Sequence, residues 1–266
     1  MAAEANPDAE RARSAAREEI PALLYHPSED VLAALLENPR FDAAHLSLLL
    51  ERKELSGEFL EEIARRKKWL AEYAVKRRLA FHVHTPRLAA MRLARQLYLM
   101  DLVQLSLLPS AAVELRRLAE ELILVRLPQV PLGQKLTLAR RGSARVAGGL
   151  IAEGQEQVAR VALDNAFLNE AQILKVLSRV NLAAPVVEVI AKHARWSQLY
   201  NVRIALLRHP KAPLTRVIGF LPDLTPRDLK ELAALSTLPA HVKHRIRDEL
   251  ARRGGGAQSR HPRRER

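Results

Sequence analysis

Two stretches of the chain match each other at one fixed separation, and an internal repeat of this kind constrains the fold more than any other sequence feature. KKWLAEYAVKRRLAFHVHTP, which begins at Lys67, matches ARWSQLYNVRIALLRHPKAP, which begins at Ala194. The same separation of 127 positions relates residues 23–108 to residues 150–235 without a gap. Its most distinctive pairs are Trp69 and Trp196, Tyr73 and Tyr200, His82 and His209, and Pro86 and Pro213. We therefore predict a duplication, with two halves that share one fold.

Each half has the sequence pattern of short helices. Apolar residues recur at three- and four-residue spacings, as at Leu46, Leu49 and Leu50, and so fall on one helical face. Aromatic residues make up only 4% of the chain, and the remaining apolar residues are mostly Leu, Ala, Val and Ile. Because Leu and Ala lose little freedom in a helix, this mixture favours helices over strands. Thr85-Pro86 and Thr225-Pro226 are predicted helix starts, with the hydroxyl at the N-cap and Pro at the first helical position.

The segment boundaries follow from the repeat and from local composition. LPQVPLGQK is rich in turn-forming residues and falls between the two copies. The final GGGAQSRHPRRER is Gly-rich and then Arg-rich, which is typical of a disordered tail. The predicted segments are a polar N-terminal segment (1–19), a first helical-repeat half (20–126), a linker with a connecting helix (127–146), a second half (147–253) and a disordered basic tail (254–266).

Several classes of protein are disfavoured by the composition. The chain has no Cys, so thiolate chemistry, disulfides and Cys-ligated zinc are excluded. The N-terminus is polar and charged, unlike a secretory signal. The longest apolar stretch, residues 88–109, contains Arg92, Arg95 and Asp101, so it is not predicted to span a membrane. We expect a cytoplasmic protein that does not act at a membrane.

Short motifs in both halves resemble those of HEAT-like proteins. Residues 202–206, VRIAL, resemble the V-R-x-A-L start of a second HEAT helix, and residues 75–79 are a weaker copy. ALLRHP at 205–210 and LENP at 36–39 look like helix ends of bacterial HEAT-like and leucine-rich-repeat-variant proteins. The acidic residue usual before V-R is Asn201 in one copy and Ala74 in the other, which leaves the family's Asp–Arg ladder without its acidic half. The resemblance implies a right-handed α-solenoid of stacked helix pairs that binds proteins or nucleic acids.

Basic residues are unevenly distributed along the chain. Of the net charge of +13, residues 127–253 contribute +10, with 20 basic and 10 acidic side chains. Residues 65–95 hold ten basic side chains against Glu72 alone, and residues 189–222 hold six with no acid. Because these runs occupy corresponding places in the two halves, they indicate a repeated surface for an anionic partner. The alternative is that they form solvated helix faces that keep the protein soluble.

The candidate binding residues combine aromatic and basic side chains. Trp69, Tyr73 and Lys76 have the spacing of one helical face, and Trp196, Tyr200 and Arg203 repeat it. Such a face suits stacking with a cation beside it, whereas the simpler interpretation makes the aromatic residues core. The predicted binding residues are Trp69, Tyr73, Lys76, Arg77, Trp196, Tyr200 and Arg203.

Catalytic candidates are few. His82 and His209 are interpreted as structural residues that bond the last carbonyls of their helices. Some HEAT-like proteins are DNA glycosylases, and in that alternative Asp101 or Asp228 would be the catalytic carboxylate. The simpler interpretation of Asp228 is an acid in the first turn of a helix. The sequence has no cofactor motif, and neither the His82–His84 pair nor the i, i+3 pair of His241 and His244 is a strong metal signal.

We therefore predict a non-enzymatic helical-repeat scaffold that holds an anionic partner on a repeated basic surface. A protein partner is expected first and a nucleic acid second, and the sequence leaves the oligomeric state open. A glycosylase-type, DNA-binding enzyme is the alternative function. In a third possibility the basic face serves solubility, and the partner binds an apolar groove that the sequence does not locate.

Overall fold

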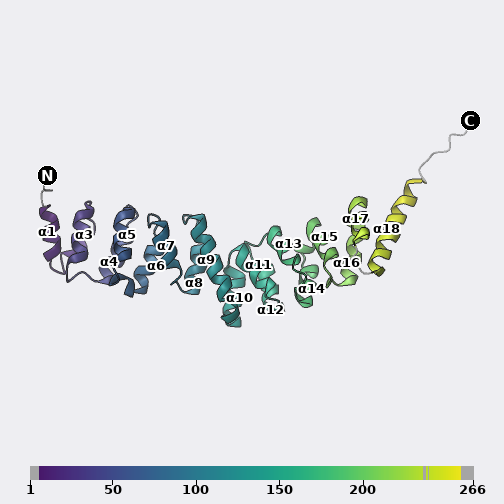
Figure 1. Ribbon diagram of the computed structural model, residues 1–266, viewed down its shortest axis with the longest axis horizontal. Helices are drawn as coiled ribbons and strands as arrows, with labels where there is room; N and C mark the ends of the chain where they lie inside the picture. Colours follow the sequence, from purple (N-terminus) through teal and green to yellow (C-terminus); the bar gives the residue numbers. More distant parts are fainter. Residues whose placement is uncertain (1–5, 236–237, 239, 259–266) are drawn as a thin grey trace, which may run out of the picture. The chain divides into compact units, whose positions relative to one another are not determined.

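The fold is helical throughout the part of the chain that the structure describes. A computed structural model describes residues 6–235, 238 and 240–258, with the side chains of residues 217 and 254–258 excluded. This part contains α-helices and short 3-10 helices and no strand. The prediction of an all-α fold is therefore confirmed. The chain divides into two compact units, which we call the first unit (up to Val125) and the second unit (from Arg126 onward). Figure 1 labels the helices of both units in chain order.

The first unit is a series of short helices. In chain order they are α1 (Pro7–Ser14), α2 (Ile20–Leu23), α3 (Glu29–Glu37), α4 (Ala43–Leu49), α5 (Gly57–Arg65), the 3-10 helix η1 (Trp69–Ala71), α6 (Tyr73–Phe81), α7 (Arg87–Ala94), α8 (Leu99–Leu107) and α9 (Val113–Arg126).

The second unit has the same kind of organisation. Its helices are η2 (Leu127–Gln129), α10 (Leu132–Arg141), α11 (Ala144–Ala152), α12 (Glu156–Leu163), α13 (Glu170–Leu177), α14 (Ala184–Lys192), η3 (Trp196–Gln198), α15 (Tyr200–Arg208), α16 (Leu214–Phe220), η4 (Leu221–Asp223), α17 (Pro226–Ala234) and α18 (Ala240–Gln258).

Helix α5 shows how the sequence produces these elements. Its N-cap Ser56 accepts a hydrogen bond from the backbone N–H of Phe59, which satisfies one of the free donors at the helix start. Phe59, Leu60, Ile63 and Ala64 are buried, and their spacing places them on one face of the helix. The polar residues between them face outward, so burial of this one stripe provides most of the stability of the helix.

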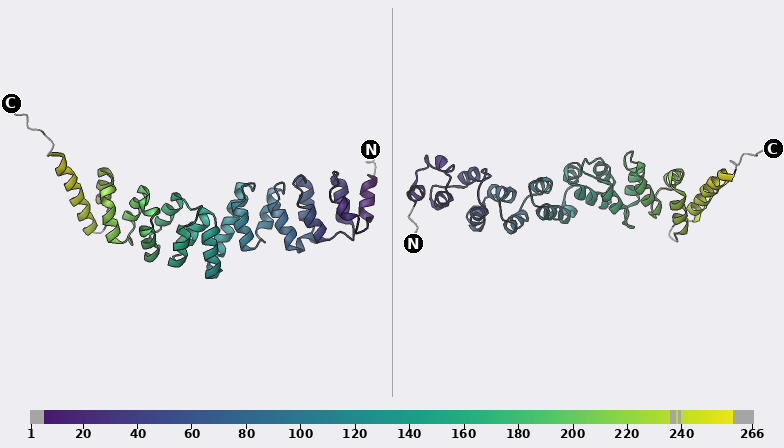
Figure 2. Two further views of the ribbon diagram at one scale, coloured as in Figure 1. Left: turned by 180° about the vertical axis from the view of Figure 1, so that it is seen from behind. Right: turned by 90° about the horizontal axis from the view of Figure 1, so that it is seen from above.

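Within each unit, helices pack on helices that are near in sequence. In the first unit α1 packs on α3, α4 on α6, and α6 on α7. In the second unit α10 packs on α12, α11 on α13, α12 on α14, and α13 on α15. Both views in Figure 2 show this progression along each unit. The core of each unit is thus built from contacts between consecutive layers of helices.

Helix starts in the two units fall at matching positions. Gly57 begins α5 and Ala184, 127 positions later, begins α14. The same interval separates the starts of η1 and η3, of α6 and α15, and of α8 and α17. Buried hydrogen bonds follow the same interval. The amide of Asn38 donates to the carbonyls of Ala12 and Ala15, and the amide of Asn165 donates to those of Ala139 and Gly142.

Two local sequence predictions have different outcomes. Thr225 is the N-cap of α17, and its hydroxyl accepts from the backbone N–H of Asp228 at 3.2 Å, as predicted. Thr85 is not a cap, because α7 begins at Arg87 with Pro86 as its N-cap residue. The Thr85 hydroxyl is instead buried without a hydrogen-bond partner.

The chain end is helical further than the predicted tail allows. Helix α18 continues to Gln258, and residues 259–266 of the predicted tail lie outside the described residues.

None of the helices in the described ranges combines the length and the apolar character that a bilayer crossing requires.

Candidate binding surface

The two tryptophans of the predicted surface are buried. Trp69 is 2% exposed and Trp196 is 1% exposed. Trp69 packs edge-on against Phe41, and the indole N–H of Trp196 donates to the carbonyl of Leu163 at 2.8 Å. Neither ring can stack on a ligand at the surface. The prediction of a tryptophan platform is therefore wrong, and both residues belong to the core.

The predicted single helical face is also interrupted. Trp69 and Trp196 lie in η1 and η3, whereas Tyr73 and Tyr200 are the first residues of α6 and α15. A residue in extended conformation separates each pair of elements, Glu72 in the first unit and Leu199 in the second. The rings of each pair therefore do not share a helical face, because the spacing rule applies only within one continuous helix.

Tyr73 is held by polar contacts with the α7–α8 connection and α8. Its hydroxyl donates to Asp101 and accepts from the backbone N–H of Tyr98. The rings of Tyr73 and Tyr98 stack with centroids 4.0 Å apart. Burial, followed by the hydrogen bond to Asp101, raises the pKa of Tyr73 to about 12. Tyr73 thus joins α6 to the start of α8, with Tyr98 as the exposed part of the pair.

Tyr200 makes the equivalent contacts in the second unit. Its hydroxyl donates to Asp228 and accepts from the backbone N–H of Thr225. The Thr225 hydroxyl also donates to Asp228 at 2.6 Å. Hydrogen bonds from Thr225 and then from Tyr200 lower the pKa of Asp228. Since a lowered pKa makes a carboxylate a weaker base at neutral pH, this arrangement suits a structural Asp.

Many basic side chains of the first run are paired with acids from outside it. Arg77 contacts Asp101 at 2.6 Å, and Arg78 contacts Glu51 at 2.9 Å. Further pairs join Arg65 to Glu61, Arg66 to Glu62, and Arg87 to Glu114. The linear count of ten cations against one acid therefore overstates the local positive charge.

The second run is partly neutralised as well. Arg203 contacts Asp223 at 2.6 Å, and its guanidinium lies over the ring of Phe220. Lys192 pairs with Glu188. Within the described ranges, no acidic side chain pairs with Lys76 in the first unit or with Arg208 in the second. These two positions keep the charge that an anionic partner would meet.

A groove of about 400 Å³, the first groove, lies between the end of α4 and α6. Its walls carry the positive charges of Lys53, Arg77 and Arg78, together with Glu51, the ion-pair partner of Arg78. The full lining is Leu50, Glu51, Lys53, Arg77, Arg78, Phe81, His82, Val83 and Ser110.

A groove of about 440 Å³, the second groove, lies between the end of α13 and α15. It occupies the corresponding place in the second unit, because most of its lining stands 127 positions after the lining of the first groove. Its chemistry differs: Val180, Ile204 and Ala205 replace the three cations of the first groove. The full lining is Leu174, Leu177, Ser178, Val180, Asn201, Ile204, Ala205, Arg208, His209 and Pro210.

The histidine that is repeated in both grooves has a structural role. His82 Nε2 donates to the carbonyl of Arg52 at 2.7 Å, and His209 Nε2 donates to that of Arg179 at 3.1 Å. The Nδ1 atoms accept backbone N–H groups two residues later. The structural interpretation of both histidines is thus supported, but each bonds the loop of an earlier helix and not the end of its own.

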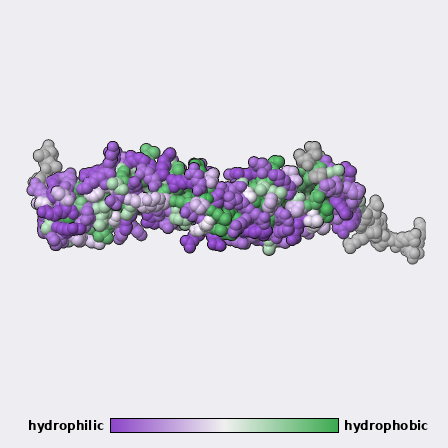
Figure 3. Space-filling model, turned by 90° about the horizontal axis from the view of Figure 1, so that it is seen from below, coloured by the Kyte–Doolittle hydropathy of each residue, from purple (hydrophilic) through white to green (hydrophobic). Residues whose placement is uncertain are grey.

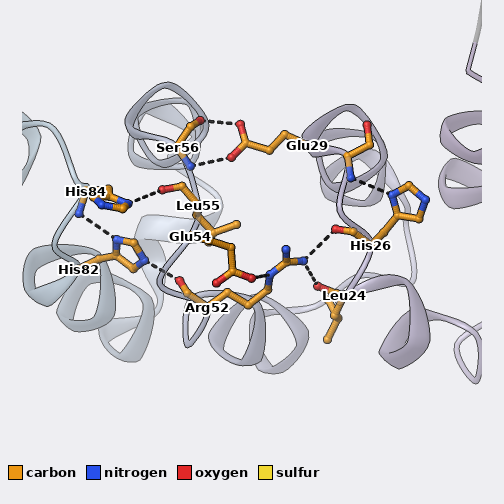
Figure 4. A network of polar contacts seen from close by, with 10 residues as sticks. Leu24, His26, Glu29, Arg52, Glu54, Leu55, Ser56, His82 and His84 are labelled. Atoms are coloured by element: carbon orange, nitrogen blue, oxygen red, sulfur yellow. Dashed lines mark hydrogen bonds and ion pairs between the residues drawn. The ribbon is translucent and has the colours of Figure 1, made fainter.

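Around His82 these bonds extend into a network that joins successive loops (Figure 4). Arg52 donates to the carbonyls of Leu24 and His26 and pairs with Glu54. Glu29 accepts from both the backbone N–H and the hydroxyl of Ser56. In the second unit Arg179 stands at the position of Arg52 but is exposed. One arginine is therefore used in structure, whereas its counterpart remains available to a ligand.

Tyr98 and both grooves were not predicted from the sequence. Tyr98 is 65% exposed and stacks on Tyr73. The repeat pattern did not reveal it, since Thr225 stands at the corresponding position. The grooves depend on how α4 lies against α6 and how α13 lies against α15, which sequence spacing does not specify.

Comparisons with protein-family models, with curated proteins and with solved structures find no match to this chain. Within the described part of the chain, no group of three or more His, Asp or Glu residues is placed to hold a metal ion.

Proposed function

We propose that this chain is a non-enzymatic scaffold that binds an anionic partner, a protein in the first place, through the two grooves and the basic side chains around them. We further propose that it is a HEAT-like, right-handed α-solenoid made of two copies of one helical array. The matching helix starts and the matching Asn38 and Asn165 bonds support the duplication. The packing of each helix on near neighbours supports the solenoid.

The observation that carries the proposal is the presence of a groove at the same place in each unit. Lys53 in the first groove and Arg208 in the second are exposed cations with no acid partner among the described side chains. The acid of the first groove, Glu51, is bound to Arg78. Such a groove attracts carboxylates or phosphates, but its lining has no unpaired acid that could act as a general base.

The glycosylase alternative receives less support from the site. Asp101 and Asp228, its candidate carboxylates, bond to tyrosine hydroxyls and line neither groove. An enzyme of this class needs a carboxylate inside the pocket that receives the base. A binding function therefore fits the geometry better than base excision.

The proposal can be tested by fluorescence anisotropy with three labelled probes: a Glu-rich peptide, a short DNA duplex and a single-stranded RNA. Titrations at about 50 and about 200 mM salt separate electrostatic binding from other contributions. The test variant is Lys53→Glu with Arg208→Glu. A matched control, Arg140→Glu with Lys230→Glu, makes the same charge change at exposed positions outside both grooves.

We expect the acidic peptide to bind, and the groove variant to weaken that binding by about tenfold or more, as loss of two charge contacts predicts. The control should change it much less. Equal losses in the two variants would mean diffuse attraction to the whole positive chain. Absence of binding by every probe at low salt would overturn the proposal, and preferential binding of nucleic acid would change the partner class.

A further inference from the structure

The second groove differs from the first in a way that indicates its ligand. Its lining combines aliphatic side chains from two helices, with Leu174 and Leu177 from α13 and Ile204 and Ala205 from α15. Val180 lies at its edge with 68% of its surface exposed. A groove of about 440 Å³ with this lining is large enough for one or two apolar side chains.

One cation lines this apolar floor, and two more are sequence neighbours of lining residues. Arg208 is part of the lining, Lys175 follows Leu174, and Arg179 stands between Ser178 and Val180. All three are exposed, and no acidic side chain within the described ranges forms an ion pair with them. Their charge suits carboxylates that flank an inserted apolar residue, and Arg208 lies in the groove itself.

The nearest acids are already engaged. Glu170, on α13, accepts from the Asn201 amide at 3.0 Å. Asp228, whose pKa is also lowered by the charge of Arg208, is held by Thr225 and Tyr200. Because these donors are neutral, both carboxylates keep their charge, and the three cations exceed the two acids by one charge.

The lining favours a protein over a nucleic acid. Single-stranded bases bind to proteins largely by stacking on aromatic rings. The second groove has no Phe, Tyr or Trp among its lining residues, whereas the first groove contains Phe81. Aliphatic surface of this kind matches a Leu, Ile or Met side chain.

We propose that the second groove is the anchor site for an acidic protein segment, which inserts an apolar side chain between α13 and α15 while its carboxylates meet Lys175, Arg179 and Arg208. This inference rests on the proposed binding function and adds to it the site and the chemistry of the partner. The first groove, with charged walls, would contribute electrostatic contacts without an apolar anchor.

The test uses two peptides and the full chain. One peptide is Glu-rich with a central pair of leucines, and its twin has serines in their place. Because the chain has no Cys, Val180→Cys can be labelled with an environment-sensitive dye. Lys53→Cys, at the corresponding edge of the first groove, gives the matched reporter.

We expect the leucine peptide to bind about tenfold more tightly than its twin, as burial of a large aliphatic side chain predicts. The dye at position 180 should respond to it and the dye at position 53 should respond much less. Leu174→Ser should abolish the advantage of the leucine peptide and leave the weaker binding of the twin. Ser47 occupies the corresponding place in α4, so serine is compatible with this type of helix.

Leu132→Ser removes an exposed leucine outside the groove and should preserve the advantage. If Leu174→Ser lowers the helix content, Ala205→Gln fills the floor without a change in charge and should have the same effect. Equal binding of the two peptides, or a retained advantage in both groove variants, would overturn this inference alone. Absence of binding by either peptide would instead refute the proposed function on which it rests.

Discussion

Two buried asparagines show how single residues fix the layers. Asn38 and Asn165 are 0% and 1% exposed. Each amide donates to one backbone carbonyl in an earlier helix, α1 or α10, and to one at the C-cap of that helix. The side-chain oxygen of each accepts a backbone N–H two residues later. Each asparagine therefore satisfies buried polar groups on two elements.

Asn165→Ala should lower the free energy of unfolding by about 1–3 kcal/mol, since it leaves buried carbonyls without a donor. Urea unfolding followed by tryptophan fluorescence measures this change. Asn181→Ala, at an exposed position, is the control and should have little effect. Similar midpoints for wild type and Asn165→Ala would show that the two carbonyls find other donors.

The hydroxyl of Tyr73 should make stability depend on alkaline pH. Its pKa is raised from 10.0 to about 12, so the folded state favours the protonated phenol. The stabilisation is fully present below pH 10 and is lost as the pH rises towards 12. In a spectroscopic titration of the four tyrosines, Tyr73 should ionise last, and Tyr73→Phe should remove that late phase. A Tyr73→Phe titration with the late phase unchanged would contradict the assignment.

At the scale of the element, the sequence specified helices better than their interruptions. Periodicity located the helical regions because burial of one apolar stripe is a local property. It extended α6 back to Trp69, where the structure has η1 and an extended residue. The Thr-Pro pattern likewise predicted an N-cap at both Thr85 and Thr225, although only Thr225 caps a helix. Such breaks depend on what lies beside the chain in the folded unit.

The candidate site was predictable only in part, for the same reason. Tyr73, Lys76 and Arg77 were identified from spacing and do lie together at the start of α6. The pairing of Arg77 with Asp101 and the burial of Trp69 depend on neighbouring helices. The contrast between the charged and the apolar groove depends on how α4 packs on α6 and how α13 packs on α15.

The start of α4 offers a test of capping. Asp42 accepts from the backbone N–H groups of Ala44 and His45. The hydrogen bond from His45 is the largest of the causes that lower the pKa of Asp42. Asp42→Ala should cost about 1 kcal/mol of stability at neutral pH. Because the folded pKa is depressed, the wild type should lose this advantage as the pH falls through it.

Asn169 provides the matched control, since it caps α13 at the corresponding place and does not titrate. Asn169→Ala should cost a similar amount, and its cost should be the same at neutral and acidic pH. Chemical unfolding at both pH values measures the two differences. A cost of Asp42→Ala that does not change with pH would contradict the role of the ionised carboxylate.

At the scale of the whole molecule, each unit has its own core and its own buried tryptophan, Trp69 in the first and Trp196 in the second. Trp196→Phe leaves a reporter of the first unit, and Trp69→Phe leaves a reporter of the second. Asn38→Ala should shift the unfolding transition reported by Trp69 and leave that of Trp196 nearly unchanged. Asn165→Ala should do the reverse. A common shift of both reporters would show that the chain unfolds as one cooperative system.

The exposed apolar residues have a consequence at the same scale. Figure 3 shows hydrophobic patches scattered among hydrophilic surface on one face of the protein. Single exposed apolar side chains are normal on a protein surface. The second groove is distinctive because aliphatic residues line one hollow with a cation at its edge.

The packing of each helix on near neighbours in sequence also affects how the protein is made. A ribosome releases the chain from its N-terminus. In the first unit α1 packs on α3, which follows it closely along the chain and so is translated soon after it. No helix there has to wait for a strand encoded far downstream, because the described part has none. Local contacts of this kind favour rapid folding. The first unit can therefore complete its core while the second is still being translated, which limits the time for which apolar surface is open to chaperones and to aggregation.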